Sequence, residues 1–290
     1  MNNPAKRRTI RKVLRHYINE WLKSLPETLT KQIKDDIVVT GGSIVSLLTG
    51  ERINDIDIYF RTIESATTVA QHYANQMDTP IEVHLEEQVN IRGETETRVI
   101  NYITSRGVAG DNGGADEADE IIGKELEPED KPKHRPMFIS RNAITLSDNI
   151  QLITRFYGEP EQIHKTFDFV HATCWYTYKN DHLELPANAL ESILSNTLYY
   201  QGSLYPIASI FRMKKFISRG WRISAGDMLK IMWQISELDL TNRELLIDQL
   251  TGVDQIYMDA LVNALTADNL EPEKRNSVYA AEVIDRIFNS

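Results

Sequence analysis

The feature that most constrains this chain is a short segment, residues 36–60, in which two β-rich runs enclose a glycine pair. The first run ends at Gly41 and Gly42, which predict a tight turn, and residues 43–48 predict a short helix. Residues 53–60 then alternate apolar and polar side chains, as a half-buried strand does. The segment therefore predicts strand, turn, helix and strand in that order.

The second predicted strand carries two aspartates, Asp55 and Asp57, that are separated by one residue. Side chains two residues apart on a strand point to the same face, so both carboxylates can ligate one metal site. Nucleotidyl transfer uses two divalent cations, one to activate the attacking oxygen and one to hold the leaving pyrophosphate. The aspartate pair therefore predicts a site for Mg²⁺ or Mn²⁺.

The glycine pair predicts the other half of such a site. Glycine lets the backbone approach a triphosphate, and the N–H groups and dipole of a following helix attract the anion. Ser43 is expected to be the N-cap of that helix. Gly41, Gly42 and Ser43 are therefore predicted to bind nucleotide.

Each of these signals is common, but their order is specific, with twelve residues between Gly42 and Asp55. This order resembles the signature of the polymerase-beta-like nucleotidyltransferase superfamily, and the match covers residues 36–60. Residues 149–176 are similar to divergent viral and phage members, in which a Phe-Asp-Phe segment begins the corresponding strand. The resemblance implies a magnesium-dependent transferase of phage origin.

The resemblance also implies a third catalytic, metal-binding carboxylate on a later strand. It favours Asp168, which begins a β-like run over residues 169–178, and the alternative is Glu82 in the run IEVHL. By spacing alone, Asp168 fits a residue that caps or ends an element equally well.

The rest of the chain predicts an α+β half followed by a helical half. Residues 5–24 predict a helix with one apolar and one basic face. The favoured interpretation is that the apolar face packs on the protein and the basic face is solvated, and the alternative is that the basic face binds nucleic acid. Residues 107–136 are polar and acidic and predict a mobile loop. We therefore expect a nucleotidyltransferase-like mixed sheet with flanking helices in residues 1–187 and an all-helical domain in residues 188–290.

A second block of charge lies in the predicted helical domain. Arg212, Lys215 and Arg219 recur at helical spacing, with Tyr205 and Trp221 nearby. These cations can bind a triphosphate while an aromatic ring stacks on the base, and the alternative is a solvated helix face. A similar pattern in the phage-like members of the superfamily favours nucleotide binding.

Composition narrows the setting of the protein. A formal net charge of -10 argues against a protein that coats nucleic acid, although local basic patches can form an RNA track. The single Cys174 cannot form an internal disulfide and is expected to be an inert buried thiol. No apolar run is long enough to span a bilayer or to form a secretory signal, which predicts a cytoplasmic protein, in the host cytoplasm if it is phage-encoded.

Other catalytic motifs are missing from the sequence. It contains no Walker-type loop and no dinucleotide-binding glycine fingerprint, which argues against a kinase and against a dehydrogenase. No histidine has the His-Glu-x-x-His spacing, and His164 and His171 are expected to be packing or surface residues.

These patterns together predict a metal-dependent nucleotidyltransferase that moves a nucleoside monophosphate from an NTP, such as ATP, to an acceptor hydroxyl with release of pyrophosphate. Asp55 and Asp57 would bind the metals, and Asp168 would complete the site and help deprotonate the acceptor. The acceptor stays open between an RNA end, a protein side chain and a small molecule, and no pattern indicates the oligomeric state. The alternative is a noncatalytic phage structural or interaction protein that retains the fold.

Overall fold

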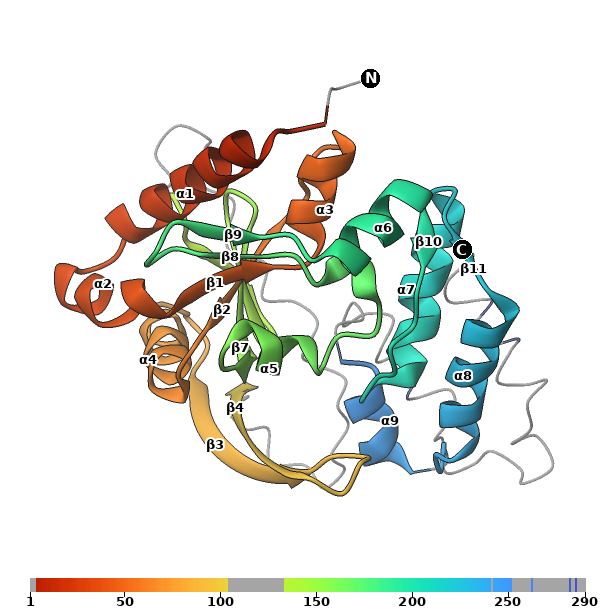
Figure 1. The fold of residues 1–290 in the computed structure, drawn as a ribbon. Coiled ribbons are helices and arrows are strands. Elements are labelled where there is room, and N and C mark those ends of the chain that lie inside the picture. The colour runs from red at the N-terminus through yellow and green to blue at the C-terminus, as the bar shows by residue number, and fades with distance from the viewer. Residues whose placement is uncertain are drawn as a thin grey trace. The chain divides into compact units, whose positions relative to one another are not determined.

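The structure is a computed structural model that describes residues 4–103, 133–240 and 242–251, together with Val262, Glu282 and Asp285 (Figure 1). The chain divides into two compact units, Met1–Ser195 and Asn196–Ser290. Most of the predicted loop over residues 107–136 lies outside the described residues.

The first unit is built on a seven-stranded mixed sheet with the strand order β5-β6-β7-β2-β1-β8-β9. β1 pairs antiparallel with β2 and β8, whereas β2 pairs parallel with β7. The strands are β1 (Ile37–Thr40), β2 (Ile56–Phe60), β5 (Pro136–Ile139), β6 (Ala143–Leu146), β7 (Ile150–Tyr157), β8 (Trp175–Thr177) and β9 (His182–Glu184). The first two strands, the turn and the helix between them follow the order predicted for residues 36–60.

Helices pack on this sheet and are joined by two short 3₁₀ turns, η1 and η2. They are α1 (Arg7–Lys23), α2 (Glu27–Ile33), η1 (Lys34–Asp36), α3 (Gly42–Thr49), α4 (Ile63–Ala74), α5 (Pro160–His164), η2 (Val170–Ala172) and α6 (Ala187–Ser195). The α+β class predicted for this half is therefore confirmed.

The two faces of the sheet are covered by different helices. On one face, Trp21 of α1 packs against Phe60 and donates from Nε1 to the Tyr73 hydroxyl of α4 at 2.8 Å. On the other face, Ile163 of α5 packs with Tyr59. Because alternate residues of a strand point to opposite faces, Asp57 shares the α5 face with Tyr59.

A separate antiparallel hairpin belongs to the same unit. It consists of β3 (Ile81–Val89) and β4 (Thr95–Ile103), paired over their whole length from Ile81↔Ile103 to Val89↔Thr95. The curved pair is drawn in orange and yellow in Figure 1.

One strand prediction is wrong. Residues 169–178 do not form a continuous strand, because the chain first makes the 3₁₀ turn η2 and only then enters β8. Hydrogen bonds hold the turn: the Thr173 hydroxyl donates to the Val170 carbonyl at 2.8 Å, and the Thr40 hydroxyl approaches the Ala172 carbonyl at 3.3 Å. Asp168 therefore does not begin a strand.

The second unit is mainly helical. Its helices are α7 (Pro206–Ser218), α8 (Ala225–Ser236) and α9 (Arg243–Gln249). Ile207, Leu246, Leu250 and Val262 form its buried apolar cluster. The end of the predicted helical domain, from residue 252 on, lies mostly outside the described residues.

Two details of this unit differ from the predictions. A two-residue parallel pair, β10 (Thr197–Leu198) with β11 (Arg222–Ile223), makes it not purely helical. The division follows Ser195 rather than residue 187, because α6 packs against η2 and α3 and so belongs to the first unit. Within the described residues, no helix is long and apolar enough to cross a membrane.

Candidate active site

The turn after β1 is shaped by Gly41. Its φ of 90° and ψ of -148° place it in a region that favours glycine, and its N–H donates to the Ala172 carbonyl at 3.2 Å. A Cβ added at Gly41 would lie 3.3 Å from Oδ2 of Asp57. The turn therefore brings the backbone of Gly41 against one of the two predicted catalytic carboxylates.

The two residues after Gly41 begin α3. The expectation that Ser43 caps this helix is wrong: the N-cap is Gly41, because its positive φ lets the helix begin at Gly42. A Cβ added at Gly42 would meet nothing within 4 Å, so the space above it is open. Ser43 is only 2% exposed, and its Oγ has no hydrogen-bond partner among the residues that the structure describes.

The two aspartates lie at the start of β2. Asp55 is exposed and directly precedes the strand, whereas Asp57 is half-buried within it. The parallel register with β7 places Gln151 beside Asp57. On the other side, β1 pairs antiparallel with β2, and Val39 faces Ile58. Extending this register by one residue places Thr40 beside Asp57. The cross-strand neighbours of Asp57 are thus an amide and a hydroxyl side chain.

The predicted third carboxylate is placed differently from the first two. Asp168 is buried in the bend between α5 and η2, two residues before the 3₁₀ turn whose Ala172 carbonyl accepts from Gly41. The alternative, Glu82, lies on β3 of the separate hairpin and pairs with His84 at 2.9 Å. Glu82 therefore belongs to an exposed ion pair away from the Asp57 strand, because β3 does not join the main sheet.

These side chains fit a metal that arrives with a nucleotide. Among the residues that the structure describes, no three His, Cys, Asp or Glu side chains gather as a preformed metal site. Mg²⁺ in phosphoryl-transfer sites commonly uses one or two carboxylates and takes its remaining ligands from substrate phosphates and water. Asp57, whose Oδ2 lies 3.3 Å from the position of a Cβ on Gly41, is a carboxylate of the kind such a site requires.

Beside this site lies His164, which the sequence predicted to be a packing or surface residue. Its Nε2 lies 2.8 Å from the Thr40 hydroxyl, which itself donates to the Cys174 carbonyl at 2.8 Å. Since the hydroxyl has one hydrogen, His164 donates its Nε2–H to Thr40. Burial lowers the pKa of His164 to about 4, so the ring is neutral at pH 7. Its contact with a residue far along the chain left no signal in local spacing.

Cys174 behaves as expected for an inert thiol. The side chain is fully buried, and burial raises the pKa of its thiol to about 12.

The predicted cations of α7 have separate environments. Arg212 is half-buried and donates from its guanidinium to the Thr251 carbonyl at 3.0 Å, whereas Lys215 is exposed. Arg219 follows the helix, and its guanidinium lies 5.3 Å from the centre of the Phe216 ring. The cationic face predicted from spacing is therefore partly used inside the second unit.

The two aromatic residues near these cations lie in the interior of the second unit. Tyr205 and Trp221 are both buried, and Trp221 packs edge-on against Phe216 with their ring centres 5.1 Å apart. Both are core residues of the second unit, because the apolar faces of its short elements have to be covered.

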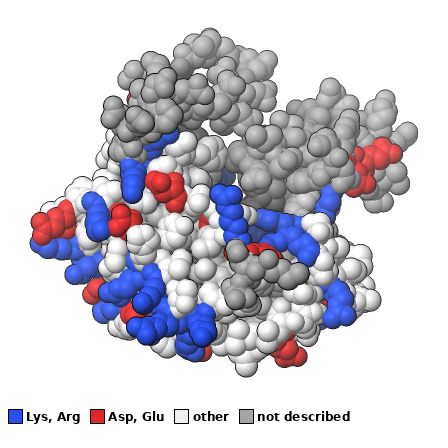
Figure 2. All heavy atoms as spheres, turned by 90° about the horizontal axis from the view of Figure 1, so that it is seen from above, with Lys and Arg blue, Asp and Glu red and all other residues white. Residues whose placement is uncertain are grey.

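The basic face of α1 is likewise partly occupied. Figure 2 shows Lys and Arg side chains gathered at its lower left, on the side where α1 lies in Figure 1. Arg11 and Arg15 approach Asp181 at 3.6 and 3.7 Å, and Arg7 donates to the Leu183 carbonyl. These contacts hold α1 on the β8–β9 hairpin, which agrees with the packed-helix interpretation.

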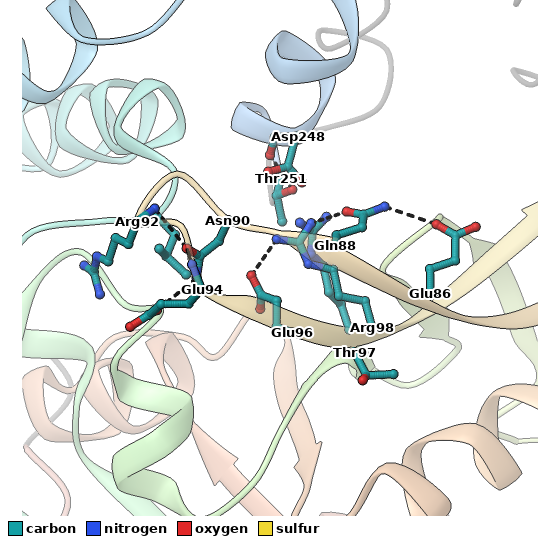
Figure 3. Close-up of polar contacts among 12 residues, drawn as sticks. Glu86, Gln88, Asn90, Arg92, Glu94, Glu96, Thr97, Arg98, Asp248 and Thr251 are labelled. Atoms are coloured by element: carbon teal, nitrogen blue, oxygen red, sulfur yellow. Dashed lines mark hydrogen bonds and ion pairs between the residues drawn. The ribbon is translucent and has the colours of Figure 1, made fainter.

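The polar residues of the β3–β4 hairpin mainly contact one another (Figure 3). Arg98 pairs with Glu96 at 2.6 Å and donates to Gln88 on the paired strand. At the hairpin turn, the Asn90 side-chain oxygen accepts from the backbone N–H groups of Arg92 and Glu94 at 2.9 and 3.1 Å. These contacts join the two strands of the hairpin and close its turn, which is a structural role for its polar residues.

Several solved structures resemble this chain in overall course. A CCA-adding enzyme in complex with ATP matches with a TM-score of 0.43 and 11% identity, over 91% of this chain and 57% of that chain. The Thermotoga maritima CCA-adding enzyme complexed with tRNA matches with a TM-score of 0.40 and 11% identity, over 89% and 57%. Likenesses this distant do not identify an activity.

Sequence relatives are more informative. The protein named "Gabija anti-defense 2" from Bacillus phage SPbetaL7 is 23% identical over 272 residues, which are 93% of this chain and 53% of the relative. The chain thus spans about half the length of that relative. The model of the Gabija anti-defense 2 protein family matches residues 8–196, more than half of the 290-residue chain. The chain therefore belongs to the Gabija anti-defense 2 family.

Proposed function

We propose that this chain is a metal-dependent nucleotidyltransferase and that its activity counters Gabija defence. It transfers a nucleoside monophosphate from an NTP to an acceptor hydroxyl and releases pyrophosphate. The observation that carries the proposal is the close approach of the Gly41 turn to Asp57, whose Oδ2 lies 3.3 Å from the position of a Cβ on Gly41. This juxtaposition supports a site in which a triphosphate on the turn meets the carboxylates.

The residues of the turn are proposed to bind the β- and γ-phosphates. Gly42 leaves open space at the first turn of α3, where backbone N–H groups and the helix dipole favour an anion. Ser43 has a buried hydroxyl without a partner, which can donate to a phosphate oxygen. Such a buried, unpaired group costs stability in the absence of ligand, as binding groups often do.

The carboxylates are proposed to hold Mg²⁺ or Mn²⁺ together with the triphosphate. When bound, the metal supplies neutralisation of phosphate charge and activation of the acceptor oxygen. Asp55 and Asp57 orient the α-phosphate relative to the turn, and Asp168 is proposed to complete the site by taking the acceptor proton. Arg212, Lys215 and Arg219 are proposed as phosphate ligands of the second unit.

The test is incubation of the purified chain with each α-labelled NTP, Mg²⁺ or Mn²⁺, and pools of RNA and protein acceptors. Asp55→Asn with Asp57→Asn should abolish label transfer. The matched control is Asp35→Asn, which removes one carboxylate from an exposed ion pair with Lys179. Equal transfer by the native chain and the double variant would contradict the proposal.

The alternative is a noncatalytic protein that counters Gabija defence through binding alone. The observation that favours it is the amide of Gln151 beside Asp57, where a carboxylate would complete a metal site. Phage infection of cells with Gabija defence separates the two functions. A double variant that folds with the native melting temperature but no longer protects the phage supports catalysis, and one that still protects it supports binding alone.

A further inference from the structure

The β3–β4 hairpin is tied to the rest of the first unit along only one of its two edges. The Asn101 N–H of β4 donates to the Arg141 carbonyl at 3.1 Å. The Tyr157 hydroxyl donates to the Thr97 carbonyl of the same strand at 2.9 Å. β3 lies on the outer side of the curved pair (Figure 1). Among the described residues, no strand pairs with the outer edge of β3, which is nine residues long.

The register shows which backbone groups of β3 point outward. In an antiparallel pair, facing residues alternate between pairs that exchange backbone hydrogen bonds and pairs that do not. The Asn90 N–H donates to the Glu94 carbonyl at 2.9 Å, and these residues extend the register by one position. The even-numbered residues of β3 therefore bond to β4. The residues that direct N–H and C=O groups away from β4 are the odd-numbered ones, Val83, Leu85, Glu87 and Val89.

β3 lacks the features that usually close an edge strand. Its register with β4 runs from Ile81 to Val89 without a bulge, and it contains no proline and no lysine. Two of its apolar side chains are largely exposed, Leu85 at 55% and Val89 at 68%. An open, regular and partly apolar edge is the surface to which an extended peptide adds as a further strand.

The charge of the hairpin determines which peptide fits. Residues 81–103 contain five glutamates and two arginines, and one of the two, Arg98, is buried. Glu87 is exposed and lies between Leu85 and Val89 on the same face of β3. A second copy of this acidic strand would bring like charges together, whereas a basic strand is complementary to it.

We propose that β3 binds an extended segment of a partner protein as a third strand of the hairpin, with the side-chain order apolar, any, basic, any, apolar. The basic side chain lies opposite Glu87, and the apolar ones lie opposite Leu85 and Val89. This order reads the same in both directions, so it holds for a parallel and for an antiparallel strand. Backbone hydrogen bonds supply the affinity, and the three side chains supply the specificity.

The inference goes beyond the proposed transferase function, because the binding needs neither metal nor NTP. It also uses other residues, since β3 does not join the sheet that carries Asp57. A partner strand on β3 therefore leaves the proposed catalytic residues as they are.

Binding is measured with the labelled peptide Ser-Thr-Val-Thr-Lys-Thr-Val-Thr-Ser, in which lysine has a valine two positions away on each side. The full chain is titrated into the peptide while fluorescence anisotropy is recorded, without metal and without NTP. We expect saturable binding that weakens as salt increases, because a charge pair contributes to it. The same peptide with glutamate in place of lysine should bind about 3- to 10-fold more weakly.

A charge exchange tests the position of the basic side chain. Glu87→Lys should weaken binding of the lysine peptide about 3- to 10-fold and should strengthen binding of the glutamate peptide by a similar factor. The matched control is Glu191→Lys, which reverses an exposed charge on α6 and should leave both affinities unchanged. A general disturbance of the hairpin would weaken both peptides, so opposite changes report the charge pair itself.

A proline tests the backbone contacts. Because the Leu85 N–H points away from β4, Leu85→Pro removes a donor for the peptide and no hydrogen bond of the hairpin. It should weaken binding about tenfold or more, whereas Leu85→Thr, which keeps the N–H, should stay within about threefold of the native affinity. Thermal melting accompanies both variants, and if Leu85→Pro melts far below the native chain, the charge exchange at Glu87 alone decides.

The outcomes are distinct. Failure of the lysine peptide to bind the native chain, or equal effects of Glu87→Lys and Glu191→Lys, overturns the inference. A dimer of the native chain that Leu85→Pro dissociates, measured by sedimentation, makes a second copy the occupant and also overturns it. The Asp55→Asn, Asp57→Asn variant should bind the lysine peptide like the native chain, so loss of label transfer alone leaves β3 assigned.

Discussion

Two glycines, one in each unit, show how differently the two regions of the molecule are built. Gly41 has a φ of 90°, and a Cβ on it would lie 3.3 Å from the Asp57 carboxylate. Gly226 lies in the first turn of α8, where a Cβ would meet only Ser224 Oγ at 3.8 Å. The first region specifies one geometry, whereas the second has open space at its glycine.

The surroundings of the two glycines follow the same difference. The turn is held by a distant part of the chain, because the Gly41 N–H donates to the Ala172 carbonyl, and it directly follows the buried Thr40. Near Gly226, by contrast, Leu229 and Trp233 are exposed, although a hydrogen bond from Tyr200 to Gln234 fixes neighbouring side chains. Precise placement suits reacting groups, whereas an open surface places fewer demands on geometry.

The largest expected effect is at Gly41. Gly41→Ala should reduce nucleotidyl transfer by about 100-fold or more, because a small displacement of the turn from Asp57 misplaces the reacting groups. Because alanine is strained at a positive φ, the substitution should also lower the free energy of unfolding by about 1–3 kcal/mol. Transfer of labelled nucleotide and thermal melting check the two effects.

Gly42→Ala is the control for the stability effect, since a Cβ at Gly42 meets nothing within 4 Å. It should melt slightly above the native chain, because alanine favours the helix and the position has room. A Gly41→Ala variant that melted and reacted like Gly42→Ala would end the contrast between the regions.

The next largest effect, on the pH dependence of stability, is expected at His164, which contacts Thr40 at the end of β1. Its folded-state pKa of about 4 lies below the ordinary value of 6.5, so the unfolded chain binds more protons between these pH values. Stability should therefore be lost as pH falls from about 6.5 to about 4, with a contribution of about 1–3 kcal/mol from this residue. Denaturant unfolding across this range checks it, against His164→Gln.

The difference between the two unfolding curves isolates His164 from other buried histidines. His134 is such a group, because burial also lowers its pKa. Parallel curves for the native chain and His164→Gln would contradict the assignment of this pH dependence to His164.

A smaller effect, with opposite signs for stability and binding, is expected at Ser43. Removing its buried, unpaired Oγ should raise the free energy of unfolding by about 1 kcal/mol. The affinity for NTP should fall roughly tenfold, through loss of one hydrogen bond to a charged phosphate. Thermal melting and NTP titration of Ser43→Ala give both numbers, and a stable variant with native NTP affinity would remove Ser43 from the site.

The smallest effect is at Gly226. Gly226→Ala should raise the free energy of unfolding by about 0.5–1 kcal/mol, because alanine favours the helix and the position has room. Urea unfolding checks the change. A loss of stability would show that this glycine, like Gly41, is required by its surroundings.

Local patterns predicted the main parts of the first region well. The alternation in residues 53–60 and the glycine pair before the helix correctly predicted β1, α3 and β2 (Figure 1). Helical spacing also predicted that residues 188–290 are mainly helical, and α7, α8 and α9 lie there. These elements depend on the period of apolar side chains and on turn residues, and both are properties of short segments.

Local patterns failed where contacts come from distant segments. The family resemblance favoured Asp168 as the residue that begins a strand, but hydrogen bonds from the Thr173 hydroxyl to Val170 and from the Gly41 N–H to Ala172 hold the following residues in η2. Spacing also placed Tyr205 and Trp221 near a nucleotide, and packing buries both. The exposed Trp233 was not singled out, because exposure depends on which elements cover it.

The sequence by itself determined the order of the elements around Gly41 and the alternation that puts Asp57 and Tyr59 on one face of β2. Only the tertiary structure decided that Gln151 lies beside Asp57 and that His164 lies against Thr40. The physical reason is range: the face of a strand follows from its two-residue period, whereas its neighbours depend on the register with strands far along the chain.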